Sequence, residues 1–219
     1  MNFDNIQAVL FDLDGTLTDS APGILGSMDY MLEKMGRTLP DGFDRSKLLG
    51  PPLSYSMKYL IGFDDEDAAE AIKLYRSRYG EIGLFENKPY DGIAEMLEAL
   101  KGAGLRLAVA TNKPEAFAVR ILERYGLIGY FDTVCGSGLS GERDTKAEVV
   151  TEALARLGVT EPERAVMVGD RKYDAEGARQ AGLECIGALW GYAGEGELEG
   201  CGAAALAASP AELAGLFIG

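Results

Sequence analysis

Four short apolar runs along the chain each end in polar residues, and the segments between them carry apolar residues at helical spacing. The runs are residues 8–11, 105–110, 165–168 and 185–188. Near-continuous apolar runs of this length are typical of strands buried on both faces of a parallel sheet. Two sets of apolar residues between the runs each share one helix face: Ile93, Met96, Leu97 and Leu100, and Val149, Val150, Ala153, Leu154 and Leu157. Strands alternating with helices predict an α/β fold with a doubly wound, Rossmann-like parallel sheet.

One long segment after the first run, from about residue 20 to residue 86, interrupts this alternation. It contains helical patterns but no run with the character of a buried strand; the patterns cover 24–35, 54–61 and 65–79. Glycines and prolines separate these patterns. We therefore expect two domains. A Rossmann-like core is formed by 1–18 and 87–219, and an all-helical domain of 19–86 is inserted into it.

Composition narrows the classes of function. The 219 residues include 35 acidic and 21 basic side chains, a net charge of −14, which disfavours nucleic acid or an anionic membrane as a partner. The chain has no histidine, so Ser-His-Asp and Cys-His catalysis and histidine metal sites are excluded. Three widely spaced cysteines suggest neither a disulfide framework nor a zinc site. No apolar run is long enough to span a bilayer and no signal peptide is evident, so we expect a cytoplasmic protein.

Two aspartates follow the first apolar run directly. Asp12 and Asp14, with Gly15 and Thr16 after them, place two carboxylates in one tight turn at the carboxyl edge of the sheet, where open α/β folds bind ligands. Two acids this close are expected to have pKa values pushed apart, so that one attacks while the other carries a proton. The alternative is a turn in which both acids merely cap the strand end.

A second pair of aspartates follows the third apolar run. Asp170 ends this run, and Asp174 lies four residues further on, where a helix start would bring the two carboxylates together. With Asp12 facing them across the sheet edge, these carboxylates would form an oxygen site suited to Mg²⁺. An N-capping aspartate with a surface neighbour is the alternative interpretation.

Three further residues are candidates for holding a phosphate. Thr111 and Asn112 follow the second apolar run and offer a hydroxyl and an amide, although N-capping before Pro114 is the more common explanation of such residues. Lys146 lies in the first turn of a predicted helix, where the helix dipole disfavours a cation unless it holds an anion or is solvated. The GxGxxG pattern at 136–141 lies four residues before the Thr145 cap of that helix, so we interpret it as a loop delivering Lys146 rather than a dinucleotide site.

These motifs, in this order, resemble those of the haloacid dehalogenase superfamily of phosphohydrolases, and the resemblance covers the whole chain. The four motifs are Asp12-Leu13-Asp14-Gly15-Thr16, Thr111-Asn112, Lys146, and Gly169-Asp170 with Asp174. The helical insert resembles the family's α-helical cap of the first type. Three segments are similar to those of a bacterial branch labelled phosphoglycolate phosphatase or 5′-nucleotidase. They are residues 50–53, 86–92 and 169–174.

The resemblance implies a mechanism for this chain. Asp12 would attack phosphorus to form an aspartyl-phosphate, and Asp14 would protonate the leaving oxygen and then deprotonate the hydrolytic water. Mg²⁺ would be bound by Asp12, the backbone carbonyl of Asp14, and Asp170, with Asp174 completing or orienting that shell. Thr111, Asn112 and Lys146 would hold the phosphoryl oxygens.

The helical insert is expected to select the substrate, a small phosphorylated metabolite. Gly50 would lie in a stiff loop over the site. A cation such as Arg45 would suit a substrate with a second anionic group, such as 2-phosphoglycolate. These basic residues are equally well explained as solvated. The alternatives are a 5′-nucleotidase, a sugar-phosphate phosphatase, a phosphomutase or a non-catalytic phosphate-binding protein. We expect a monomer or small homo-oligomer.

Overall fold

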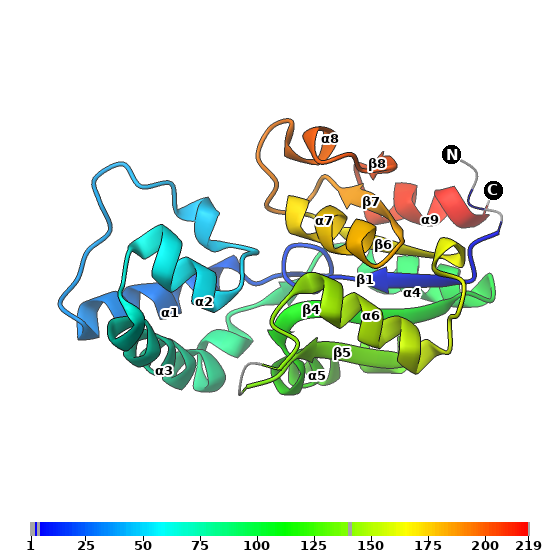
Figure 1. Cartoon of the computed structure of the whole chain (residues 1–219). Coiled ribbons are helices and arrows are strands. Elements are labelled where there is room, and N and C mark those ends of the chain that lie inside the picture. The colour runs from blue at the N-terminus through cyan, green and yellow to red at the C-terminus, as the bar shows by residue number, and fades with distance from the viewer. Residues whose placement is uncertain (1–2, 4, 140–141, 219) are drawn as a thin grey trace.

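Strand β1 (Ala8–Phe11) lies near the middle of a six-stranded sheet, and all four of its residues are fully buried. We describe the protein from a computed structural model, which covers residue 3 and residues 5–139 and 142–218. The sheet is parallel throughout and has the order β5-β4-β1-β6-β7-β8 (Figure 1). Its other strands are β4 (Arg106–Pro114), β5 (Thr133–Ser137), β6 (Ala165–Gly169), β7 (Glu184–Ala188) and β8 (Ala205–Ala207). The predicted doubly wound α/β fold is confirmed.

Helices cover both faces of the sheet because the side chains of its strands alternate between two apolar clusters. Val9 and Phe11 of β1 belong to one cluster, and Ala8 and Leu10 belong to the other. The first cluster contains residues of α4 (Ile93–Gly102), α5 (Glu115–Arg124) and α9 (Pro210–Ile218). The second contains residues of α6 (Lys146–Leu157) and α7 (Lys172–Gln180). Short helical turns complete this part: η4 (Ile128–Tyr130), η5 (Pro162–Arg164) and α8 (Glu197–Gly200).

A group of helices, drawn in blue to teal in Figure 1, lies beyond the carboxyl ends of the strands. These helices are α1 (Ala21–Lys34), η1 (Arg45–Leu48), α2 (Leu53–Tyr55), the π-helical η2 (Ser56–Ile61), α3 (Asp65–Glu81) and η3 (Gly83–Phe85). The two connections to the sheet pair as short antiparallel strands, β2 (Thr18–Asp19) and β3 (Lys88–Pro89). The division into a core of 1–18 and 87–219 and a cap of 19–86 stays a prediction, and we place its boundary at this strand pair.

Two local expectations differ from the structure. Strand β4 does not end at residue 110 but continues to Pro114, with a register shift against β5 between Thr111 and Pro114. Thr111 and Asn112 therefore lie within the strand, and Pro114 rather than either of them occupies the N-cap of α5, so the capping alternative is wrong. The composition of 191–208, rich in glycine, alanine and glutamate, predicts a loop with a short strand near 203–206, and the structure adds α8 to this segment. Among the described residues, no helix is both long and apolar enough to cross a membrane.

Candidate active site

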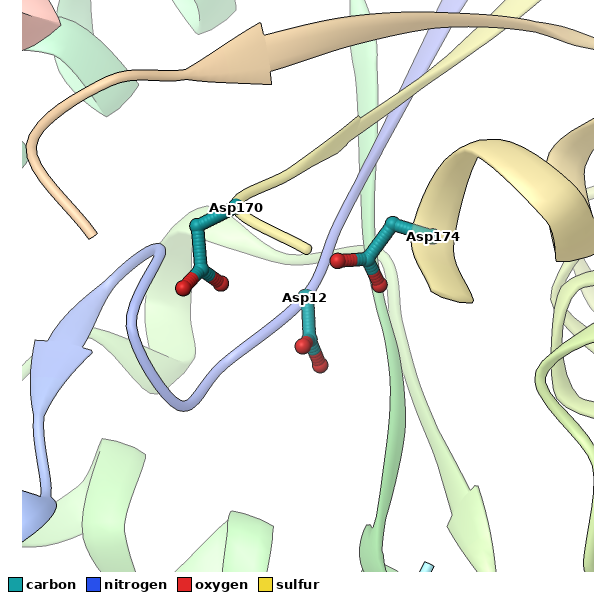
Figure 2. A group of neighbouring side chains, drawn as sticks. All are labelled: Asp12, Asp170 and Asp174. Carbon is teal, nitrogen blue, oxygen red and sulfur yellow. The ribbon is translucent and has the colours of Figure 1, made fainter. Parts of the chain in front are cut away.

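Three aspartate side chains meet at the carboxyl edge of the sheet (Figure 2). Asp12 follows β1, Asp170 follows β6 and Asp174 lies in the first turn of α7, and one carboxylate oxygen from each lies within 4.8 Å of the others. Strands β1 and β6 are neighbours, so their ends bring Asp12 and Asp170 together. The order of strands reverses at β1, and ligands of open α/β sheets bind at such a switch point.

Asp170 is held in place by the turn after Asp12. Thr16 donates a hydrogen bond from Oγ1 to Asp170 Oδ1 at 3.0 Å, and the backbone N–H of Tyr192 donates to Oδ2 at 2.7 Å. Gly15 has a φ of +88°, and a Cβ at this position would lie 2.2 Å from Asp170 Oδ2. The turn can therefore contact the carboxylate only because residue 15 is glycine.

Lys146 joins the other two aspartates. Its Nζ lies 2.9 Å from Asp12 Oδ1 and 2.8 Å from Asp174 Oδ1, and it donates a hydrogen bond to the carbonyl of Ala110 at 3.1 Å. The backbone N–H of Arg171 donates to Asp174 Oδ2 at 3.0 Å. The expected Thr145 cap is present, and it forms a capping box with Glu148 that fixes the first turn of α6, which carries Lys146.

Burial makes the charged forms of these side chains costly and shifts their pKa values. Desolvation, followed by the charges of Asp174 and Asp12, raises the pKa of Asp170 well above its usual value. Desolvation also raises the pKa of Asp174, to about 6, against the opposing effect of Lys146. Burial alone would lower the pKa of Lys146, but the charges of Asp12 and Asp174 raise it. One ammonium group thus faces three carboxylates, a set of hard oxygen donors that fits a bound Mg²⁺.

Asp14 lies outside this group of three. Its carboxylate pairs with Lys113, whose Nζ lies 2.8 Å from Asp14 Oδ2 and donates to the hydroxyl of Tyr79 at 2.5 Å. The predicted metal role of Asp14 involved its backbone carbonyl, and that role stays a prediction. Sequence reasoning missed Lys113. Its only signal was its position directly after Asn112, at the end of a strand pointing toward the site.

A cavity of about 320 Å³ separates the carboxyl edge of the sheet from the helical insert. Asp12, Asp14, Thr111 and Asn112 line it from the sheet side, and Gly50 lines it from the insert. Among the described residues that line this cavity, Lys146, Asp170 and Asp174 do not appear, which places them behind Asp12.

Arg45, predicted to contact substrate, is also absent from the described lining of the cavity. Its Nη2 instead pairs with Asp29 Oδ1 at 2.6 Å, and both side chains are about half exposed. This geometry associates Arg45 with the outer surface of the insert rather than with a ligand.

The loop expected to deliver Lys146 is only partly described, because Ser140 and Gly141 of the GxGxxG pattern lie outside the described residues. Its first glycine, Gly136, has a structural reason to be there. A Cβ at this position would lie 2.5 Å from the carbonyl oxygen of Lys113. Close approach of β5 to β4 therefore accounts for this glycine without a nucleotide.

The sequence matches the family of haloacid dehalogenase-like hydrolases over residues 9–188. The chain belongs to this family, and the resemblance inferred from its motifs is confirmed. The chain is 42% identical over 190 residues to a 5′-nucleotidase of Pseudomonas aeruginosa, covering 87% of this chain and 86% of that protein. It is 36% identical over 189 residues to a phosphoglycolate phosphatase of Aquifex aeolicus, covering 85% and 86% of the two chains.

A third relative is the tyrosine-protein kinase PtkA of Mycobacterium tuberculosis, which is 43% identical over 187 residues. That match covers 85% of this chain and 63% of PtkA, so the chain spans less than two thirds of that relative's length. The crystal structure of a predicted phosphatase from Clostridium acetobutylicum is also similar. It has a TM-score of 0.91, 43% identity, and coverage of 96% of this chain and 97% of that one.

Proposed function

We propose that this protein is a Mg²⁺-dependent phosphatase that hydrolyses small phosphate monoesters through an aspartyl-phosphate on Asp12. The position of Asp12 carries the proposal. Of the three clustered aspartates, Asp12 alone is among the described residues that line the cavity. The nucleophile is therefore the carboxylate that touches both the charged cluster and the space where a substrate would bind.

The chemistry divides between Asp12 and Asp14. An oxygen of Asp12 attacks phosphorus, the bond from phosphorus to the ester oxygen breaks, and Asp14 gives that oxygen a proton. A water molecule then attacks the phosphorus of the aspartyl-phosphate while Asp14 accepts its proton. The bond from phosphorus to the Asp12 oxygen breaks, and inorganic phosphate leaves. Asp14 suits this role because it also lines the cavity, and the absence of histidine leaves a carboxylate as the natural proton carrier.

The remaining polar groups orient the reacting atoms. Lys146 holds the Asp12 carboxylate at 2.9 Å and offsets its charge, while Thr111 and Asn112 face the phosphoryl oxygens from the cavity wall. Asp12, Asp170 and Asp174 would hold Mg²⁺, which when bound offsets the negative charge of the phosphoryl group.

The identity of the leaving group stays a prediction. The sequence predicts phosphoglycolate, and the similar proteins include one named for phosphoglycolate and one named for nucleotides. A phosphomutase and a non-catalytic phosphate-binding protein would each give a different result in the same experiment. A mutase would yield an isomeric phosphate rather than free phosphate, and a binding protein would yield neither.

The experiment is a steady-state panel of phosphate monoesters measured for release of inorganic phosphate, with Mg²⁺ and with EDTA. We expect hydrolysis that EDTA abolishes and added Mg²⁺ restores. No phosphate release from protein shown to be folded by circular dichroism would contradict the proposal.

A further inference from the structure

Aromatic side chains from both sides of the cavity contact one another along its wall. Tyr75 and Tyr79 of α3 stack with ring centroids 5.4 Å apart and an interplanar angle of 8°. Phe117 of α5 continues this row, with its centroid 5.8 Å from that of Tyr79. All three line the cavity, as do the apolar side chains of Met28 and Ile72. Such a wall gains free energy from a flat apolar group rather than from a small hydrophilic one.

The charges around the cavity disfavour a second anion on the substrate. The cations among its described lining residues are Lys113, which pairs with Asp14 at 2.8 Å, and Arg76, which donates to the carbonyl of Leu139 at 2.8 Å. Both already have partners. The carboxylate of Asp144 also lines the cavity and would repel an anionic group.

Besides Oδ1 of Asp14, two polar groups in the same lining have no partner among the described residues. They are the hydroxyl of Ser56, a fully buried residue, and Oδ1 of Asn112. A buried polar atom without a partner is costly, so these groups point to a ligand that supplies hydrogen bonds. The cavity therefore combines a flat apolar wall with a few unpaired polar atoms.

We propose that the substrate's leaving group carries an aromatic ring that packs against Tyr75, Tyr79 and Phe117, as in a nucleoside monophosphate or an aryl phosphate. This inference rests on the proposed phosphatase function and specifies its substrate class. A two-carbon acid such as glycolate would leave the aromatic wall uncovered and would place a carboxylate in a cavity whose lining includes Asp144.

The first test compares kcat/KM for four esters of primary alcohols: adenosine and uridine 5′-monophosphates against phosphoglycolate and glycerol 3-phosphate. Because all four leaving groups are primary alcohols, differences in kcat/KM report binding rather than leaving-group reactivity. We expect the nucleotides to be preferred by about tenfold or more, since base–aromatic stacking is a strong interaction. Phosphotyrosine distinguishes the two sources of the ring. Because its phenol leaves more readily than an alcohol, its binding to Asp12→Asn protein is compared rather than its rate, and tighter binding than that of the nucleotides would identify an aryl phosphate.

A pair of variants locates the effect. Tyr75→Leu and Phe117→Leu each remove one ring of the wall and should lower kcat/KM for aromatic substrates by roughly three- to tenfold. Their kcat/KM for glycerol 3-phosphate should change less than about twofold. Tyr59→Leu is the matched control, because Tyr59 is 73% exposed and does not appear in the described lining of the cavity.

Failure of this inference is distinguishable from failure of the proposed function. Phosphoglycolate or glycerol 3-phosphate hydrolysed faster than every aromatic ester would overturn the inference while leaving the phosphatase intact. An equal loss on both substrate classes in the wall variants would overturn it as well. Calorimetry on Asp12→Asn protein measures binding without turnover. We expect uridine 5′-monophosphate to bind more tightly than phosphoglycolate. The reverse order would contradict an aromatic leaving group.

Discussion

Asp12, Asp14, Asp170 and Asp174 are chemically identical residues whose surroundings give them different properties. Asp12 touches Lys146 and the cavity, whereas Asp14 touches Lys113 and the cavity. Asp170 and Asp174 are 0% and 1% exposed, and burial raises the pKa of both. The proposed nucleophile, proton carrier and two metal ligands are therefore one residue type placed in four different surroundings.

The proposed role of Asp14 predicts a dependence on the leaving group. Asp14→Asn cannot donate a proton, and general acid catalysis is typically worth about 10² to 10⁴ in rate. We expect a loss of this size with uridine 5′-monophosphate, whose leaving alkoxide needs protonation, and a smaller loss with p-nitrophenyl phosphate, whose phenolate leaves readily. Steady-state kcat/KM for both substrates measures this difference. Equal losses on both would argue that Asp14 does not protonate the leaving group.

The acidic cluster predicts that the effect of Mg²⁺ on stability depends on pH. The folded pKa of Asp174, about 6, lies above its ordinary value of 3.8, so without metal its contribution to stability is present at low pH and is lost as pH rises from about 4 to about 6. Mg²⁺ needs the ionised carboxylates, so its stabilising effect should grow over the same range.

Thermal unfolding with Mg²⁺ and with EDTA tests this expectation. At a Mg²⁺ concentration about 100 times its Kd, the stabilisation would be about 2.7 kcal/mol, or roughly 5–10 °C in Tm for a chain of this size. We expect that gain near pH 7 and a clearly smaller one near pH 5. Asp174→Asn should reduce the dependence on pH, and a Tm gain that is the same at both pH values would contradict the expectation.

At the scale of residues, the sequence predicted which side chains come together better than which neighbours they have. The positions of Asp12 and Asp170 at neighbouring strand ends follow from the pattern of apolar runs. The pairing of Asp14 with Lys113 does not, because it depends on the unexpected extension of β4 past residue 110. Arg45 shows the opposite error, since proximity in the sequence to Gly50 did not place it at the cavity.

Among the elements, α7 is one of those that link the sheet edge to the insert. Arg171, at its N-cap, donates from its guanidinium to the carbonyl of Leu49 and pairs with Glu197 at 2.8 Å, with its side chain 9% exposed. The next residue of the insert, Gly50, has a φ of +102°, and a Cβ there would lie 2.9 Å from Arg171 Cγ. One arginine therefore helps hold the loop that lines the cavity, beside the backbone that orients Asp174.

Loss of this arginine should affect both stability and substrate binding. Arg171→Ala removes one partner of a largely buried ion pair, which typically costs about 3–5 kcal/mol, and it releases the loop at Gly50. We expect a lower free energy of unfolding in urea and a raised KM. The matched control is Arg164→Ala, because Arg164 pairs with Glu161 at the surface, where an ion pair is worth at most about 1 kcal/mol. Arg171→Ala losing no more stability than Arg164→Ala would refute this role.

The helices were predictable where their apolar spacing was regular and less so where packing determined them. The expected helix at 65–79 corresponds to α3, and the capping box at Thr145 marks the start of α6. By contrast, the expected helix at 54–61 is a short α2 that continues as the π-helical η2. A π-helix shifts the backbone hydrogen bonds by one residue, and sequence periodicity carries no clear signal for that shift.

At the scale of the whole molecule, the proposed function requires a chain with a net charge of −14 to bind an anionic phosphate ester. Two lysines offset part of the negative charge of the aspartates there, since Lys146 pairs with Asp12 and Lys113 pairs with Asp14, and a bound Mg²⁺ would offset more of it. One apolar cluster runs from the sheet into the insert, so the two sides of the cavity are packed against a shared core. The fold was predictable because it depends on strand and helix patterns, whereas the cavity lining depends on how distant segments pack.

The central claim is that Asp12 is the nucleophile, and Asp12→Asn tests it most directly. The asparagine side chain keeps the shape of the site but cannot readily form the aspartyl-phosphate. The measurement is kcat with Mg²⁺ for the best substrate of the panel, on protein whose thermal unfolding confirms that it is folded. We predict that kcat falls by at least a hundredfold, or about 2.7 kcal/mol of activation free energy. A folded Asp12→Asn protein that keeps more than about a hundredth of the activity would contradict the claim.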